Sequence, residues 1–137
     1  MSTAESTEIL ESAPAIEGED FSRVALTPAA VELLGRLREV HGALMFHQSG
    51  GCCDGSAPMC YPAGDFLTGP ADVLLGVFRL PGDPATAELE FWISREQFEY
   101  WRHTHLTVDV VAGRGSGFSV EAPEGRRFLI RSSLLPG

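Results

Sequence analysis

The chain has 137 residues, the length of one typical domain, and 44% of them are hydrophobic, as in ordinary globular proteins. Its formal net charge is −9, and all ten of its basic residues are arginine. This acidic balance excludes the basic surface with which nucleic-acid-binding proteins contact phosphates, and it argues against binding to anionic lipid. No apolar run approaches the roughly 18 residues that a membrane span needs.

The first twenty residues are expected to form a disordered acidic arm. They hold six acidic residues and no basic residue, in a context of Ser, Thr and Ala. They contain neither a basic leader nor an apolar stretch, so we expect no secretory signal and a cytoplasmic protein. The sequence therefore predicts an arm over residues 1–20 and one domain over residues 21–137.

The first regular element in the predicted domain is a helix. Thr27 is suited to the N-cap, and Pro28 is suited to the first helical position, where its missing N–H costs nothing. Gly42 can adopt the left-handed conformation that ends a helix. Between these signals the apolar residues recur at helical spacing: Ala30, Leu33, Leu34 and Leu37.

The helix is followed by a strand and then by a long irregular segment. The short apolar run Ala43–Gln48 is typical of a strand. Residues 50–69 are expected to lack regular structure because Pro58 and Pro62 interrupt them. Further strands are predicted over residues 73–80, 88–93, 106–111, 117–121 and 127–132.

A second, short helix is predicted between two of these strands. Ser94 and Gln97 fit a capping box, and the helix is expected to run to about His103. The order of elements predicts an α+β fold with a curved mixed or antiparallel sheet covered by one main helix. A small domain with a flat sheet and exposed aromatic residues is also expected to form a homodimer.

The chemically distinctive segment is a thiol-rich loop. Cys52, Cys53 and Cys60 lie within nine residues, among several glycines, and the chain has no other cysteine. An odd number of cysteines without a secretory signal argues against a disulfide framework and favours a metal site or a reactive thiol. With His47, these thiols are ligands that zinc or iron accepts, although one of the adjacent pair is expected to be spare. The alternative is cysteines that only pack in the core.

A second candidate is the pair His103 and His105. Residues two apart on a strand point to the same side, so both imidazoles could face one site. The alternative is a pair of surface histidines. The candidate metal ligands are therefore Cys52, Cys53, Cys60, His47, His103 and His105.

Two segments, Met45–Pro62 and Gln97–Leu106, closely resemble a bacterial domain family, the domain-of-unknown-function family 779 (DUF779). The resemblance covers about residues 26–132. Members of that family are often encoded beside aldehyde dehydrogenases, so the resemblance implies a role in aldehyde metabolism with an aldehyde dehydrogenase as partner.

A weaker resemblance is to the A-type iron–sulfur carrier (HesB-like) proteins. It rests on Leu26–Ala30 followed by a helix, a strand and Gly50–Cys52. It implies a similar small β-rich fold. The carriers have a close pair of C-terminal cysteines that serve as ligands. This chain departs from that pattern because it has no cysteine after Cys60.

These observations give three hypotheses for the function. The first is a metal-binding accessory protein, loaded with zinc or iron, that works with an aldehyde dehydrogenase. The second is a thiolate-dependent enzyme that acts on an aldehyde or a thiol adduct through Cys52 or Cys53. The third is a protein-interaction module whose cysteines are structural.

Overall fold

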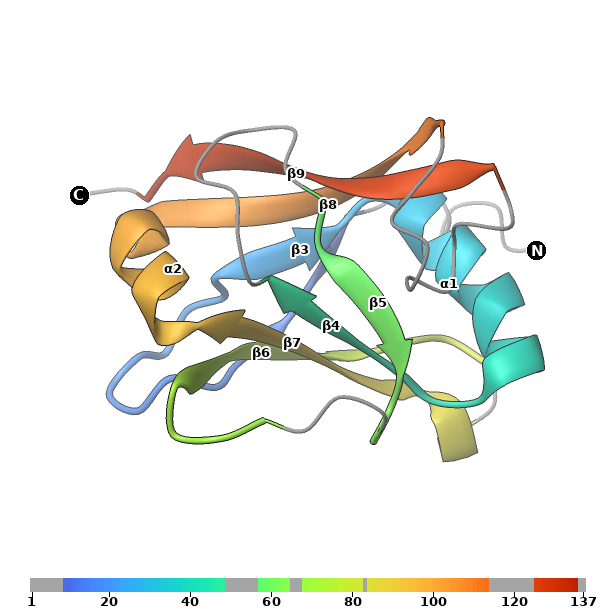
Figure 1. Ribbon diagram of the computed structural model, residues 1–137, viewed down its shortest axis with the longest axis horizontal. Helices are drawn as coiled ribbons and strands as arrows, with labels where there is room; N and C mark the ends of the chain where they lie inside the picture. The colour runs from blue at the N-terminus through green and yellow to red at the C-terminus, as the bar shows by residue number, and fades with distance from the viewer. Residues whose placement is uncertain (1–8, 49–56, 65–67, 83, 114–124, 136–137) are drawn as a thin grey trace.

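A computed structural model of the chain describes residues 9–48, 57–64, 68–82, 84–113 and 125–135. The described residues form two β-sheets and two α-helices (Figure 1). Sheet A contains, in spatial order, β1 (Leu10–Glu11), β3 (Val24–Leu26), β8 (Thr104–Ala112) and β9 (Arg126–Leu134). Sheet B contains β2 (Ala13–Pro14), β6 (Asp72–Arg79), β7 (Glu88–Ser94), β4 (Leu44–Gln48) and β5 (Met59–Pro62).

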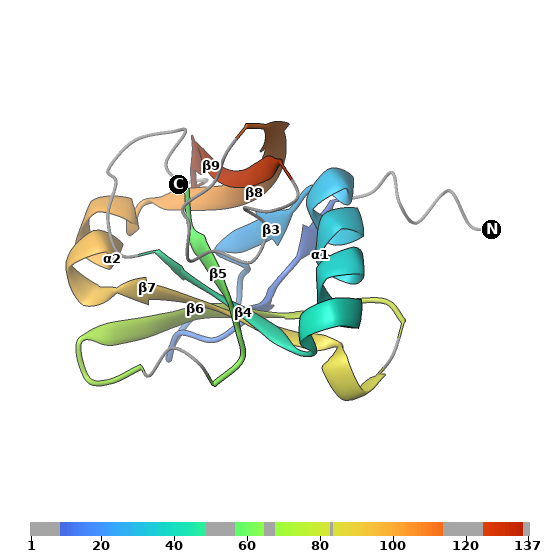
Figure 2. The ribbon, with the colours of Figure 1, turned by 45° about the vertical axis from the view of Figure 1, so that its right-hand side comes forward.

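The long helix α1 (Pro28–His41) forms where the sequence predicts it. The Thr27 hydroxyl accepts a hydrogen bond from the N–H of Ala30, and Gly42 ends the helix with a φ of +80°. The apolar side of α1 that the helical spacing predicts is buried. In Figure 2 this helix closes one end of the space between the two sheets.

The short helix α2 (Arg95–Trp101) lies at the opposite end (Figure 1). The Ser94 hydroxyl accepts a hydrogen bond from the N–H of Gln97, which confirms the predicted cap. The helix ends at Trp101, slightly before the predicted end at His103. A short 3-10 turn, η2 (Pro84–Thr86), precedes β7.

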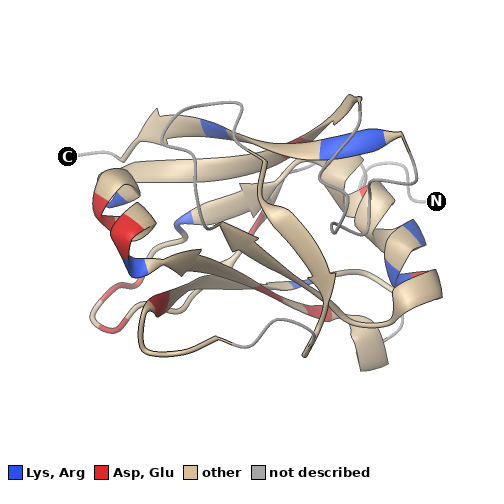
Figure 3. Ribbon diagram, in the orientation of Figure 1, with Lys and Arg blue, Asp and Glu red and all other residues tan. Residues whose placement is uncertain are grey.

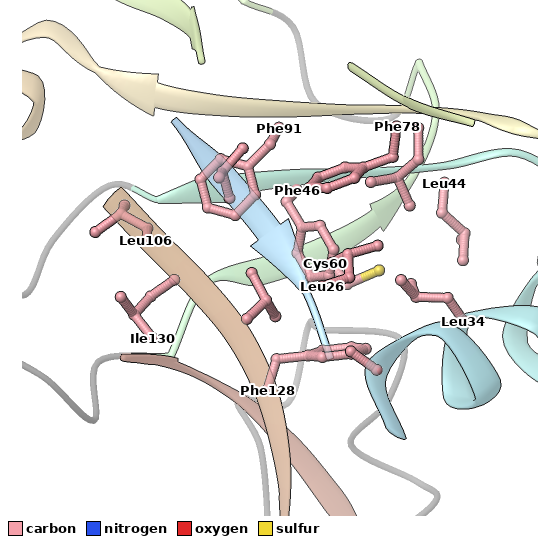
Figure 4. Close-up of a cluster of buried hydrophobic side chains, with 14 of the residues drawn as sticks. Leu26, Leu34, Leu44, Phe46, Cys60, Phe78, Phe91, Leu106, Phe128 and Ile130 are labelled. Atoms are coloured by element: carbon pink, nitrogen blue, oxygen red, sulfur yellow. The ribbon is translucent and has the colours of Figure 1, made fainter. Parts of the chain in front are cut away.

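The hydrophobic core lies between the two sheets. Phe46 of β4 contacts Phe128 of β9 edge to face, with ring centroids 4.9 Å apart, and it also contacts Phe91 of β7 at 5.5 Å. Figure 4 shows these rings among aliphatic side chains from both sheets and from α1. All three phenylalanines are completely buried. The cross-sheet contact therefore joins the two layers of the domain.

The α+β class and the mixed sheet character are confirmed, but the prediction of one sheet covered by one main helix is wrong. Two sheets pack on each other, and a helix closes each end of the core. Parallel pairs occur in both sheets, β3 with β8 and β4 with β7. The second sheet was not predicted because β1, β2 and β3 are only two or three residues long, too short to show alternation.

The N-terminal segment differs from the predicted disordered arm. Residues 1–8 lie outside the described part of the chain, but residues 10–14 belong to the two sheets. Leu10 pairs with Leu26 in sheet A, and Ala13 pairs with Val77 in sheet B. Leu10 also packs against the core, so burial of this side chain favours order despite the acidic composition around it.

The second part of the thiol-rich loop, which contains Cys60, also differs from the prediction. Met59–Pro62 forms edge strand β5, antiparallel to β4, although residues 50–69 were expected to be irregular. Pro62 is tolerated because it ends an edge strand, where a missing N–H does not break a central ladder. The strand predicted over residues 117–121 lies outside the described residues. The remaining predicted strands are confirmed, with ends shifted by one or two residues.

The described parts of the connection from β5 to β6 lie on the outer side of sheet B, the side away from sheet A. β7 and β4 lie between these two strands, so the chain must cross them. Figures 1 and 2 show the described parts of this connection, residues 63–64 and 68–71, on that side. The N–H of Ala63 donates to Ala43, and the carbonyl of Ala71 accepts from Arg95. These bonds tie the connection to the sheet beneath it.

Acidic and basic residues are interspersed over both helices and both sheets in the described part of the chain (Figure 3). No helix among the described residues is long and apolar enough to cross a membrane.

One glycine marks the point where the N-terminal segment passes from sheet A to sheet B. A Cβ added to Gly76 would lie 2.3 Å from Oγ and 2.7 Å from Cβ of Ser12, and 3.1 Å from Val24. Ser12 is buried, and its backbone N–H donates to the carbonyl of Val24. Only glycine therefore allows this close approach between the crossing segment and β6.

We expect Gly76→Ala to lower the free energy of unfolding by about 1–3 kcal/mol, because the new methyl group overpacks the core against Ser12. Gly35→Ala on α1 is the matched control. A Cβ at this position meets no atom within 4 Å, and alanine favours a helix more than glycine does, so this variant should be slightly more stable. Urea unfolding monitored by circular dichroism measures both. Equal stability of the two variants would contradict the proposed close approach.

Candidate functional site

The candidate site contains a buried histidine–carboxylate pair on the outer side of sheet B. Phe46 points into the core, so the next residue of β4, His47, points to the opposite side of the sheet. Its Nε2 lies 2.7 Å from Oδ1 of Asp72. The two side chains are only 4% and 14% exposed, so the pair is largely shielded from water.

Strand register explains how these two residues meet. His47 lies beside Trp92 of β7, and Asp72 lies beside Ser94 of the same strand. The imidazole therefore reaches diagonally across β7 to the carboxylate on β6. The N–H of Gly69 donates to the other carboxylate oxygen at 2.9 Å, which fixes the orientation of Asp72.

These contacts favour the ionised form of Asp72. The hydrogen bond from His47 holds the pKa of this carboxyl below its ordinary value of 3.8, and burial opposes the effect. The N–H of Gly69 and the charge interaction with His47 lower the pKa further. A carboxylate fixed in this way holds the imidazole of His47 in one orientation.

A cavity of about 400 Å³ lies between sheet B and the β5–β6 connection, and its lining includes Trp92, the neighbour of His47 in the sheet, but neither His47 nor Asp72. The indole N–H of Trp92 donates to Oε1 of Glu90 at 2.9 Å, so both side chains are held at its floor. The remaining lining residues are Leu44, Met45, Ala63, Gly64, Thr68 and Glu88. The cavity combines an aromatic and thioether surface with two carboxylates.

The thiol loop follows directly after this site in the chain. β4 ends at Gln48, and residues 49–56, which include Cys52 and Cys53, lie outside the described residues. Chain connectivity alone limits the Cα atom of Cys52 to within about 18 Å of that of His47. The histidine–carboxylate pair is thus attached to the end of the segment that carries these two thiols.

Cys60 lies on the other side of sheet B from His47. It pairs with Phe46 across β4 and β5, points into the core and is completely buried (Figure 4). Its thiol is packed among Leu, Ile and Phe side chains of the core. The structure therefore does not bring this predicted ligand to His47.

The other two candidate ligands belong to sheet A. His103 is exposed between α2 and β8, and Nε2 of His105 lies 2.8 Å from Oε1 of Glu11. Within the described ranges, no group of three His, Cys, Asp or Glu side chains is arranged to hold a metal ion. Of the six predicted ligands, only His47 lies at this site among those the structure describes.

Sequence reasoning missed Asp72, Glu90 and Trp92. Asp72 is separated from His47 by 25 residues, and no motif connects them. The alternation of residues 88–93 does predict that Glu88 and Glu90 lie on the same side of the strand. It gives no indication that the connection from β5 covers that side.

Comparison with known proteins gives one match. Residues 33–134, from within α1 to the end of β9, match the model of the family described as "Domain of unknown function (DUF779)". The strands β1, β2 and β3 precede the matched region. No curated protein and no solved structure gives a significant match.

Asp72→Asn is expected to lower the free energy of unfolding at pH 7 by roughly 1–3 kcal/mol, because it removes a hydrogen bond to a charged group. Folding lowers the pKa of Asp72, so its stabilisation is complete above its ordinary pKa of 3.8 and is lost as the pH falls through the lower folded value. The difference from wild type should therefore shrink in acid. Urea unfolding at pH 7 and at steps below pH 4 measures it.

The control for this prediction is Glu99→Gln. Glu99 pairs with Arg102 on the surface, with both side chains more than half exposed, so its removal should change stability little at any pH. A difference between Asp72→Asn and wild type that stays constant down to pH 2 would contradict the assigned role of the carboxylate.

Cys60 should resist alkylation in the folded protein, because its side chain has no exposed surface. Iodoacetamide labelling followed by peptide mass spectrometry, with and without urea, measures this. We expect Cys60 to be labelled only when urea unfolds the chain. Rapid labelling of Cys60 without urea would show that the core opens readily around β5.

Proposed function

The chain belongs to the DUF779 family, and we propose that it is an accessory protein of aldehyde metabolism that captures aldehydes as adducts of a thiol in the 49–56 loop. The observation that carries this proposal is the buried pair of His47 and Asp72 at the end of the strand leading into that loop. A thiol becomes a strong nucleophile when an oriented base removes its proton. Asp72 supplies that orientation for His47.

The proposed reaction is a reversible addition that needs no oxidant or reductant. The imidazole of His47 takes the proton from the thiol of Cys52 or Cys53. The thiolate attacks the carbonyl carbon, so a C–S bond forms while the C=O π bond opens. The carbonyl oxygen then takes the proton back from the imidazolium, giving a hemithioacetal.

The surroundings of the pair support this chemistry. The carboxylate of Asp72 stabilises the imidazolium formed in the first step and keeps the ring in one orientation. The neighbouring cavity gives the apolar part of an aldehyde a surface of Met45 and Trp92. An aldehyde bound there would be partly shielded from water.

The proposed partner is an aldehyde dehydrogenase, which would consume the aldehyde released from the adduct. This partner comes from the family resemblance in the sequence. The homodimer and the cytoplasmic location expected from the sequence stay predictions.

A zinc or iron site is the second candidate function, and the same pair favours it. Histidines that bind metals usually donate their other ring N–H to a carboxylate, as His47 could to Asp72. The ligands would be His47 and one of Cys52 and Cys53, because Cys60 is buried in the core and His103 and His105 belong to the region of sheet A. This set is smaller than the four ligands of a structural zinc site, so it is the weaker candidate. The HesB-like carrier fold stays a prediction.

Thiol reactivity separates these functions. At pH 7 we expect Cys52 or Cys53 to react with iodoacetamide at least about tenfold faster than a free peptide thiol. Asp72→Asn should slow this alkylation about tenfold. Asp109→Asn is the matched control, because Asp109 is another partly buried, hydrogen-bonded aspartate, but in sheet A. Carbon-13 NMR with labelled acetaldehyde should show a hemithioacetal carbon in wild type.

Protection of both loop thiols that a chelator removes, with about one equivalent of zinc or iron in the untagged protein, would favour the metal site. Slow reaction of all three cysteines without metal would contradict both proposals and favour an interaction module with structural cysteines.

A further inference from the structure

A second cavity lies on sheet A, remote from the thiol loop in the chain. It has a volume of about 660 Å³ and is lined by the N-terminal segment, by β8 and by the end of β9. Two ionisable side chains, Glu11 and His105, meet there, and Nε2 of the imidazole lies 2.8 Å from Oε1 of the carboxylate. The cavity thus contains a histidine–carboxylate pair that the proposed function does not use.

Strand register places the polar groups of this cavity. His105 lies directly opposite Ser133 in the antiparallel pair of β8 and β9, so their side chains are neighbours on the same side of sheet A. Glu11 lies opposite Ala25 on β3, whose small side chain leaves room for the carboxylate to reach His105. The hydroxyl of Ser133 has no hydrogen-bond partner among the described residues.

The walls of the cavity are apolar. Phe21 is 41% exposed and Leu134 is 81% exposed, and both line it together with Leu135. Large apolar side chains left in water around a few convergent polar groups are typical of a small-molecule site. The cavity is open to solvent on one side, so a ligand could enter without unfolding the domain.

From this arrangement we propose that the cavity binds a neutral alcohol with a short apolar chain. The carboxylate of Glu11 repels an anionic ligand. Because Glu11 already has His105 as a hydrogen-bond partner, the ligand need not carry a positive charge. A hydroxyl group can donate to Glu11 and accept from the hydroxyl of Ser133 at once. The apolar chain would cover Phe21 and Leu134.

The test is a titration of the protein with 1-hexanol, hexanoate and hexylammonium, followed by two-dimensional NMR. Hexanol should shift the signals of His105 and Ser133, and both charged probes should bind at least about tenfold more weakly. Hexanol has no carbonyl group and cannot form the thiol adduct proposed above. The result is therefore independent of the chemistry at the 49–56 loop.

Variants locate the binding site. His105→Leu and Glu11→Gln should each weaken hexanol binding about tenfold. The first removes the imidazole that holds Glu11 in place, and the second replaces the charged acceptor with a neutral amide, which forms a weaker hydrogen bond. His103→Leu is the matched control, since this exposed neighbour does not line the cavity, and binding should be unchanged. Glu11 is 55% exposed, so Glu11→Gln remains informative if His105→Leu does not fold.

Three results would overturn the proposal. The first is hexanoate or hexylammonium binding as tightly as hexanol. The second is the absence of saturable binding by any of the three probes. The third is unchanged hexanol affinity in both His105→Leu and Glu11→Gln.

Discussion

The contact of Phe46 with Phe128 is the interaction on which the arrangement of the molecule depends. It joins β4 of one sheet to β9 of the other, and it fixes which side of β4 faces the core. Because side chains alternate along a strand, an inward Phe46 requires an outward His47. The same register turns Cys60 inward. One packing contact thus separates a histidine and a cysteine that are close in the sequence.

Both histidine–carboxylate pairs use the same geometry. His47 on β4 reaches Asp72 on β6 across β7, and His105 on β8 reaches Glu11 on β1 across β3. In each case the strand that is crossed runs parallel to the histidine's strand and antiparallel to the carboxylate's strand. Each pair therefore connects three strands through side chains on the outer side of its sheet, opposite the core.

Local signals in the sequence predicted the elements that depend on local interactions. The caps at Thr27 and Ser94 located both helices, since a cap acts over three residues. Long-range pairing could not be predicted in this way. Asp72 meets His47 only because β7 lies between their strands, and Glu11 is ordered only because β1 adds to an edge of sheet A. Both acidic partners are therefore results of topology, which a single sequence does not display.

The passage of the N-terminal segment at Ser12 has a consequence for shortened forms of this protein. Within five residues, the chain adds β1 to sheet A and β2 to sheet B. A form that starts at residue 21, or at residue 33 where the family match begins, would lack both strands. β6 would then present unpaired backbone N–H and C=O groups to other molecules, and so would β3 in the form that starts at residue 21 or β8 in the form that starts at residue 33. Aggregation of such a form would reflect two uncovered sheet edges, even though most of its core residues were still present.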